Sequence, residues 1–279
     1  MPMLKREDGI ELHYEERGEG PLVALVPYLN VHPTAFEPLI AELEEDHRLV
    51  RYDARGYGES TRSGPHDGDT AAADLCAVAE HEGGGAVVVA LADSCGPAVR
   101  AAARHPELVG TVIAVGTMPV SLQAFRESES LVSSESVVDA LLEQFGRDYR
   151  GALRSLVTAT NQQMSEEEIR RRVDAQEAYA PQEAVVERLH GWTEDDPLEF
   201  GREIGDRLWL LIAPEVAGIW FPAGEEMKAV IGPLLPEAHL EEIADGIVSR
   251  PDLTAAIVRR VAAAMAAGGD IESGRARRP

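Results

Sequence analysis

Short apolar runs alternate with amphipathic segments along most of the chain. The continuous runs at residues 22–26 and 86–91 are typical of strands that are buried on both faces of a sheet. Toward the end of the chain, apolar residues recur at every fourth position from Leu253 to Met265, which predicts a helix. This alternation is typical of the α/β class, in which helices cover both faces of a mostly parallel sheet.

The N-terminal segment follows a different pattern. Ile10, Leu12 and Tyr14 alternate with polar residues, and the turn at residues 18–20 (GEG) leads directly to the run at 22–26. Alternation followed by a glycine turn predicts an antiparallel hairpin at the start of the sheet.

The pattern changes again in the middle of the chain. Between residues 118 and 202 no strand-like run occurs, charged residues become frequent, and apolar residues fall at helical spacing. Strand-like character returns at residues 208–213. We therefore predict a helical cap, residues 118–202, inserted into an α/β core made of residues 1–117 and 203–279.

Acidic residues strongly outnumber basic ones. With 49 Asp and Glu against 26 Lys and Arg, the formal net charge of −23 repels nucleic-acid phosphates and anionic lipid surfaces. No apolar stretch is long enough to span a membrane, and the first residues lack the apolar segment of a signal peptide. We expect a cytoplasmic protein that binds neither nucleic acid nor membranes. Its two cysteines, Cys76 and Cys95, are too few for a disulfide framework.

We expect no metal and no cofactor. The segment 66–69 (HDGD) contains metal-ligand side chains but is typical of a solvated turn, and 83–85 (GGG) lacks the Lys and Ser or Thr of a phosphate-binding loop. The charged run at 166–172 (EEEIRRR) predicts an exposed helix face with ion pairs. Nothing in the sequence decides between a monomer and a homo-oligomer.

The strand predicted at residues 86–91 ends in a motif with candidate chemistry. It is followed by the residues ADSCG and then by a segment with helical character. A sharp strand-to-helix turn exposes Ser94 at the carboxyl edge of the sheet as a candidate nucleophile, with the Cys95 amide directed at developing negative charge. Asp93 beside it is either a helix-start carboxylate or an acid or base of the pocket.

Five segments combine strand ends, turns and helix starts in a recognisable order. They are 25–28 (LVPY), 53–60 (DARGYGES), 92–96 (ADSCG), 105–109 (HPELV) and 245–251 (DGIVSRP). On these segments, which span almost the whole chain, the sequence resembles α/β-hydrolase-fold proteins with a helical cap. The resemblance implies a mostly parallel sheet of eight strands with the cap inserted.

The catalytic residues that the resemblance implies are incomplete. The family places its general-base histidine after a glycine, but Gly246 is followed by Ile247, whose hydrocarbon side chain cannot take a proton. The acid expected after the strand at 208–213 has only Glu215 as an approximate counterpart. We therefore expect no histidine within hydrogen-bond reach of the Ser94 hydroxyl.

Two further departures concern the turns. Ala92 replaces the glycine that usually begins the elbow motif, and Pro27 and Tyr28 stand where the family usually has His-Gly in its oxyanion loop. His32, in the loop after them, and His190, in the cap, are the candidates for a relocated base.

A pocket under the cap is expected to bind a small molecule or a modified peptide. Its predicted lining residues are Pro27, Tyr28, His32, Cys95, Met118, His190, Trp192, Trp220 and Ile247.

Three functions compete for this pocket. A serine hydrolase, either an esterase or an amidase, would use Ser94 with a relocated base, and a non-catalytic binding protein would use the pocket alone. We favour a third function, proton-transfer chemistry such as epimerisation or isomerisation in natural-product biosynthesis. It resembles the atypical members without a triad that include the aspartate epimerase of bottromycin biosynthesis. Triad residues act as a unit, so the missing histidine counts only against the hydrolase. On this hypothesis simple esters are not turned over, and Ser94→Ala leaves the native activity largely intact.

Overall fold

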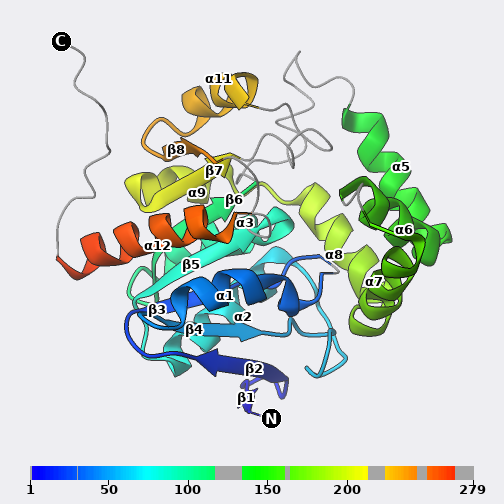
Figure 1. The fold of residues 1–279 in the computed structure, drawn as a ribbon, viewed down its shortest axis with the longest axis horizontal. Helices are drawn as coiled ribbons and strands as arrows, with labels where there is room; N and C mark the ends of the chain where they lie inside the picture. The colour runs from blue at the N-terminus through cyan, green and yellow to red at the C-terminus, as the bar shows by residue number, and fades with distance from the viewer. Residues whose placement is uncertain are drawn as a thin grey trace.

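The computed structural model describes residues 2–29, 31–116, 134–160, 164–212, 224–243 and 250–267. Within them, eight strands form one sheet in the order β1-β2-β4-β3-β5-β6-β7-β8 (Figure 1). Their bounds are β1 Met3–Lys5, β2 Glu11–Arg17, β3 Leu22–Leu25, β4 Arg48–Tyr52, β5 Ala86–Leu91, β6 Val109–Val115, β7 Leu208–Ile212 and β8 His239–Glu242. Strand β2 pairs antiparallel with β1 and β4, and all other neighbours are parallel. The predicted mostly parallel sheet of eight strands is confirmed.

The predicted hairpin at the start of the chain is wrong. Strand β4 lies between β2 and β3, antiparallel to the first and parallel to the second. The turn after β2 packs against the segment that precedes β4, so closely that a Cβ on Gly18 would meet the backbone oxygen of His47 at 2.2 Å. This contact between segments far apart in the sequence places β2 next to β4 and not next to β3. A local turn pattern cannot show such a contact.

Helices cover both faces of the sheet (Figure 1). One face is covered by α2 Gly68–His81, α3 Cys95–Arg104, α9 Leu198–Ile204 and α11 Gly224–Leu234, and the other by α1 Glu37–Leu43 and α12 Pro251–Ala266. Because side chains alternate along a strand, Val88 and Ala90 of β5 pack into the first layer, and Val87 and Val89 into the second. This burial on both faces explains the continuous apolar run.

A separate group of helices lies beside the sheet (Figure 1). It consists of α5 Ser134–Arg147, α6 Tyr149–Thr160, α7 Glu166–Tyr179 and α8 Gln182–Glu194. These helices have their own apolar cluster, which includes Phe145, Leu153, Val173 and Val185. The described part of residues 118–202 contains helices and no strand, as the pattern predicted. We call α5–α8 the cap helices.

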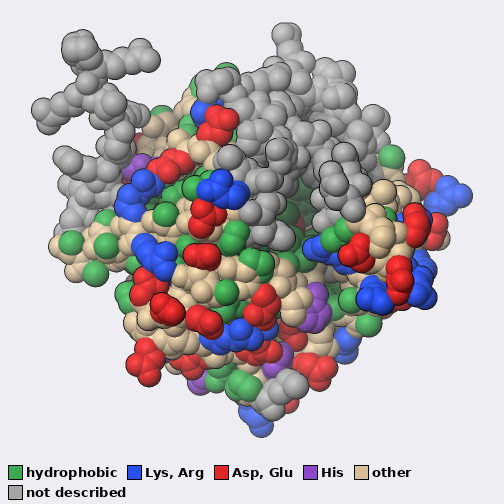
Figure 2. All heavy atoms as spheres, viewed as in Figure 1, with side chains coloured by type: hydrophobic (Ala, Val, Ile, Leu, Met, Phe, Trp, Pro, Cys, Tyr) green, Lys and Arg blue, Asp and Glu red, His purple; other side chains and the backbone are tan. Residues whose placement is uncertain are grey.

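The exposed surface of the cap helices carries acidic and basic side chains side by side (Figure 2). The predicted ion pairs of the charged run are present: Arg171 contacts Glu167 at 2.5 Å one turn away, with both side chains exposed. Such surface pairs contribute little stability, on the order of 0–1 kcal/mol each in general. The run at 166–172 therefore marks a solvated face.

Two kinds of feature are missing from the part of the chain that the structure describes. It holds no helix with the length and apolar character needed to cross a membrane. It also holds no group of three or more His, Cys, Asp or Glu side chains arranged to bind a metal ion.

Candidate active site

The turn between β5 and α3 is the centre of the candidate site. Strand β5 ends at Leu91, and a short 3-10 turn, Ala92–Ser94, leads into α3. Ala92 has a φ of +47°, in the left-handed region that non-glycine residues rarely adopt, whereas Ser94 has an ordinary helical φ of −74°. The structure therefore differs from the sequence prediction, because the residue at the strained corner is Ala92 and not Ser94.

The sequence pattern fits two registers, which explains the difference. A nucleophile elbow needs small residues two positions before and two positions after the corner. With Ser94 at the corner those positions are Ala92 and Gly96, and with Ala92 at the corner they are Ala90 and Ser94. Only the positive φ shows which register the backbone takes.

The Ser94 hydroxyl is used inside the turn. It is completely buried, donates a hydrogen bond to the Leu91 carbonyl at 2.7 Å, and accepts one from the Leu91 amide at 2.8 Å. It therefore closes the end of β5 and does not face a cavity, contrary to the expectation for a nucleophile. This pairing leaves its oxygen little freedom to attack a substrate.

A change at Ala92 tests where the corner lies. Ala92→Gly should raise the free energy of unfolding by about 0.5–1 kcal/mol, because glycine accepts a positive φ without strain. Ala90→Gly is the control: it lies two residues earlier in β5, where removing a buried methyl should lower stability by about 1 kcal/mol or more. Urea unfolding measures both. Destabilisation by Ala92→Gly as large as that by Ala90→Gly would place the corner elsewhere.

Asp93, the residue after the corner, is held by a cap residue. Its buried carboxylate accepts a hydrogen bond from the Leu29 amide at 2.8 Å and forms an ion pair with the guanidinium Nε of Arg188 in α8. Arg188 also donates to the Pro27 carbonyl at 2.9 Å and is itself buried. Burial opposes the charge on Arg188, but the Asp93 carboxylate outweighs it, and the pKa of Arg188 is raised. We name this contact the Asp93–Arg188 pair; it joins the cap helices to the corner.

The Asp93–Arg188 pair involves an amide that corresponds to an oxyanion donor of α/β-hydrolases. In α/β-hydrolases the oxyanion is held by the amide after the nucleophile and by an amide from the loop after β3. The amide from that loop here is Leu29, whose φ of +33° is also in the left-handed region, and it is already bonded to Asp93. One oxyanion donor is thus taken by the chain's own carboxylate, and the corner carries a methyl group.

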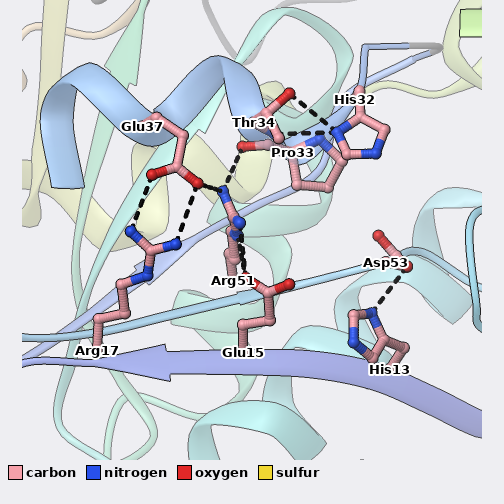
Figure 3. A network of polar contacts seen from close by, with 9 residues as sticks. All are labelled: His13, Glu15, Arg17, His32, Pro33, Thr34, Glu37, Arg51 and Asp53. Carbon is pink, nitrogen blue, oxygen red and sulfur yellow. Dashed lines mark hydrogen bonds and ion pairs between the residues drawn. The ribbon is translucent and has the colours of Figure 1, made fainter. Parts of the chain in front are cut away.

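Ion pairs on the outer strands hold the loop with His32 (Figure 3). Arg51 of β4 contacts Glu15 at 2.6 Å and Glu37 at 2.7 Å, and it donates to the Pro33 carbonyl at 3.2 Å. Because Arg51 itself is buried, these contacts tie the start of the segment before α1 to the sheet.

The His32 ring has a defined orientation. Its Nδ1 accepts a hydrogen bond from the Thr34 amide at 3.2 Å, so the neutral ring carries its proton on Nε2 and offers a donor there. Partial burial lowers the pKa of His32, which favours this neutral form at pH 7. The ring centre lies 4.8 Å from that of Tyr179, at the end of cap helix α7. His32 therefore lies at the surface of the loop before α1, next to the cap.

The structure also describes four other predicted lining residues, Tyr28, Cys95, His190 and Trp192. Tyr28 is half-buried with its ring edge-on to Phe36, and burial raises the pKa of its hydroxyl. Cys95 is buried in the core behind the corner, where burial raises the pKa of the thiol. On α8, His190 is exposed and Trp192 packs against the apolar cluster of the cap helices.

Three predicted lining residues and one candidate acid lie outside the described residues. They are Met118, Trp220, Ile247 and Glu215.

The sequence analysis missed the aromatic layer between the cap and the sheet. Tyr57, in the segment after β4, and Tyr179 have ring centres 5.8 Å apart, and both side chains are more than nine-tenths buried. The Arg188 guanidinium lies 5.9 Å from the Tyr57 ring centre. Arg188 and Asp93 are 95 positions apart, so no local pattern could have found their contact.

Comparison with known proteins agrees with this architecture. The model of the alpha/beta hydrolase fold family matches residues 28–172. A 2-(acetamidomethylene)succinate hydrolase of Mesorhizobium japonicum is 29% identical over 133 residues, covering 47% of this chain and 46% of that protein. The match therefore spans about half of this relative's length.

Solved structures extend the likeness over most of the chain. An esterase from Exiguobacterium antarcticum has a TM-score of 0.77 at 18% identity and covers 93% of this chain and 98% of its own. A bromoperoxidase from Bacillus anthracis has a TM-score of 0.72, also at 18% identity, and covers 91% and 95%. At this identity the likeness concerns the fold. From the sheet order, the strained corner and the family match together, this chain belongs to the α/β-hydrolase fold family.

Proposed function

We propose that this protein binds a small molecule or modified peptide under its cap and catalyses a proton transfer of the epimerisation or isomerisation type. The observation that carries the proposal is Ala92 at the strained corner, where a serine hydrolase needs its nucleophile. A methyl group cannot form an acyl-enzyme. The nearby Ser94 hydroxyl is fully engaged with the Leu91 backbone.

The surroundings of the corner support the same proposal. Acyl transfer requires a nucleophile, a base and oxyanion donors that act together. Here the Leu29 amide is bonded to Asp93, and the positive charge of Arg188 is balanced by the same carboxylate. Proton transfer needs less from the corner: a base, a group that stabilises the developing charge, and a pocket that excludes water.

A second candidate is hydrolysis with water as the attacking nucleophile. The partial match to a 2-(acetamidomethylene)succinate hydrolase and the structural likeness to esterases favour it. Such a reaction would pass through a tetrahedral intermediate that is not bonded to the protein, so it is compatible with alanine at the corner. It would still need a donor for the carbonyl oxygen in place of the occupied Leu29 amide.

Ester turnover and hydrogen exchange distinguish these functions. We expect p-nitrophenyl acetate to be cleaved no faster by the native protein than by a denatured sample, and intact mass to show no fluorophosphonate adduct. We expect NMR in D2O to show faster exchange of the α-protons of phenylacetone with the native protein, and Ser94→Ala to leave that rate unchanged.

The alternatives make different predictions for the same measurements. A fluorophosphonate adduct at Ser94, or burst kinetics with the ester, would replace the proposal with serine hydrolysis. Ester cleavage that persists without a burst in Ser94→Ala, combined with no exchange into phenylacetone, would establish the water-dependent hydrolysis instead.

A further inference from the structure

A histidine with a buried side chain lies where cap helix α8 meets the core. His66 belongs to the segment between β4 and α2, and its side chain is only 8% exposed, although the pattern at 66–69 predicts a solvated turn. The ring packs edge-on to Tyr57, with ring centres 6.1 Å apart. It also lies so close to Gly56 that a Cβ there would meet the imidazole Cε1 at 2.2 Å. The ring therefore has little room to turn toward solvent.

The segment around His66 contacts α8 directly. The His66 amide donates to Glu187 Oε1 at 3.1 Å, and the imidazole Nε2 lies 3.9 Å from the other oxygen of the same carboxylate. One turn further along α8, a Cβ on Gly191 would lie within 4 Å of the backbone of residues 66 and 67. Helix α8 also carries Arg188, which holds Asp93 beside the corner. Movement of α8 away from His66 would therefore open the candidate site.

A small cavity lies beside His66 at this junction. Its volume is about 20 Å³, and its polar lining residues are Tyr52, Arg55, His66, Asp74 and Arg188. A cavity of this size has room for about one water molecule, far fewer than hydrate an imidazolium ion in solution. The docked cap therefore leaves a charged His66 poorly hydrated, which disfavours the charged form.

The charges around His66 do not compensate for this loss of hydration. The groups that face the ring are Glu187 and Arg188 on α8, Arg55 and Tyr57 after β4, Tyr52 on β4 and Asp74 on α2. Asp74 already accepts two hydrogen bonds from Arg55, both at 2.7 Å, and the Glu187 side chain is half exposed. The two phenols stay neutral, because burial raises the pKa of each. In the segment of His66 itself, Asp67 accepts from the Thr70 amide at 2.7 Å and caps α2.

These surroundings keep the docked His66 neutral at pH 7. Burial lowers the pKa of the ring below its ordinary value of 6.5. The Glu187 carboxylate opposes this effect, and the positive charges of Arg188 and Arg55 add to it.

We propose that protonation of His66 releases α8 from the core, so that the cap opens over the candidate site at mildly acidic pH. Opening matters for the pocket to which we assign a function, and in that respect this inference rests on the proposed function. With α8 moved away, the imidazolium is hydrated and its repulsion from Arg188 is relieved. The open state therefore binds the proton more tightly than the docked state. The full docking free energy is present above pH 6.5 and is lost as the pH falls through the lower pKa of the docked ring.

Hydrogen exchange detected by mass spectrometry measures the docking of α8. The protection of α8 amides, corrected for the pH dependence of intrinsic exchange, should fall by about threefold to tenfold between about pH 7.5 and about pH 5.5. The protection of α2 and α3, which cover the sheet, should change by less than about twofold over the same range. NMR of the His66 ring should give a titration midpoint below 6.5.

Three variants identify the titrating group. His66→Gln keeps a planar polar side chain that takes up no proton, so it should abolish the pH dependence of α8 protection. His239→Gln is the matched control: burial also lowers the pKa of His239, but this residue begins β8 and stacks on Trp209, so the pH dependence should remain. Glu187→Gln keeps an acceptor for the His66 amide and removes a charge that favours the imidazolium, so it should increase the loss of protection at low pH.

Several outcomes would overturn the inference. They are α8 protection that does not change with pH, the native pH dependence in His66→Gln, or a His66 titration midpoint at or above 6.5. Loss of the pH dependence in Glu187→Gln would identify that carboxylate as the titrating group instead, and a parallel loss of protection in α2 and α3 would indicate acid unfolding of the whole protein. If His66→Gln does not fold, the ring titration and Glu187→Gln still decide the question. None of these measurements involves turnover, so their failure is distinguishable from a failure to exchange α-protons.

Discussion

Arg188→Leu should lower the free energy of unfolding by about 3–5 kcal/mol, the largest effect that we expect from a single substitution. Asp93 and Arg188 are both buried, and the arginine also donates to the Pro27 carbonyl. Removing the guanidinium leaves a buried carboxylate that, among the described residues, keeps its hydrogen bond from the Leu29 amide. Urea unfolding followed by circular dichroism measures the loss.

Two further variants serve as controls for the Arg188→Leu prediction. Asp93→Asn combined with Arg188→Leu should be more stable than Arg188→Leu alone, because asparagine carries no charge and can still accept from Leu29. Arg150→Gln removes an arginine of α6 whose ion pairs with Asp174 and Glu177 are exposed, and it should leave the unfolding midpoint unchanged. An Arg188→Leu protein as stable as Arg150→Gln would mean that the Asp93–Arg188 pair does not hold the cap.

Gly58→Ala should destabilise the protein by about 2–4 kcal/mol. Gly58 has a φ of +48°, and a Cβ there would lie 2.3 Å from the Asp53 carboxylate and 2.8 Å from the Tyr179 ring. Relief requires either moving Asp53 from His13 or lifting α7 from the sheet, and the second would also break the bond from the Gly58 amide to Tyr179. We therefore expect faster proteolysis within the cap helices as well.

Gly83→Ala isolates the conformational part of this effect. Gly83 has a φ of +93°, and a Cβ there would meet nothing within 4 Å. Its substitution should cost about 1–2 kcal/mol from backbone strain alone, with no change in proteolysis of the cap. Equal losses in Gly58→Ala and Gly83→Ala would show that the close contact between cap and core is absent.

The sheet was largely predictable because local patterns carry its information. A strand covered on both faces must be apolar along its whole length, and β5 and β7 are recognisable in the sequence for this reason. The cap followed from the loss of such runs after β6. The position of β2 was not predictable, because the packing of the Gly18 turn against the segment before β4 decides which neighbour it takes.

The candidate site, like the sheet, was predicted only in part from the sequence. The sequence alone was enough to identify the family and the strand that carries the corner, because these depend on residue types at short spacing. The tertiary structure decided that Ala92 occupies the corner, since one motif fitted two registers and only backbone geometry separates them. It also decided that Asp93 meets Arg188 and that Tyr57 meets Tyr179, because docking the cap on the sheet brings together residues about a hundred positions apart, and no local pattern records such contacts.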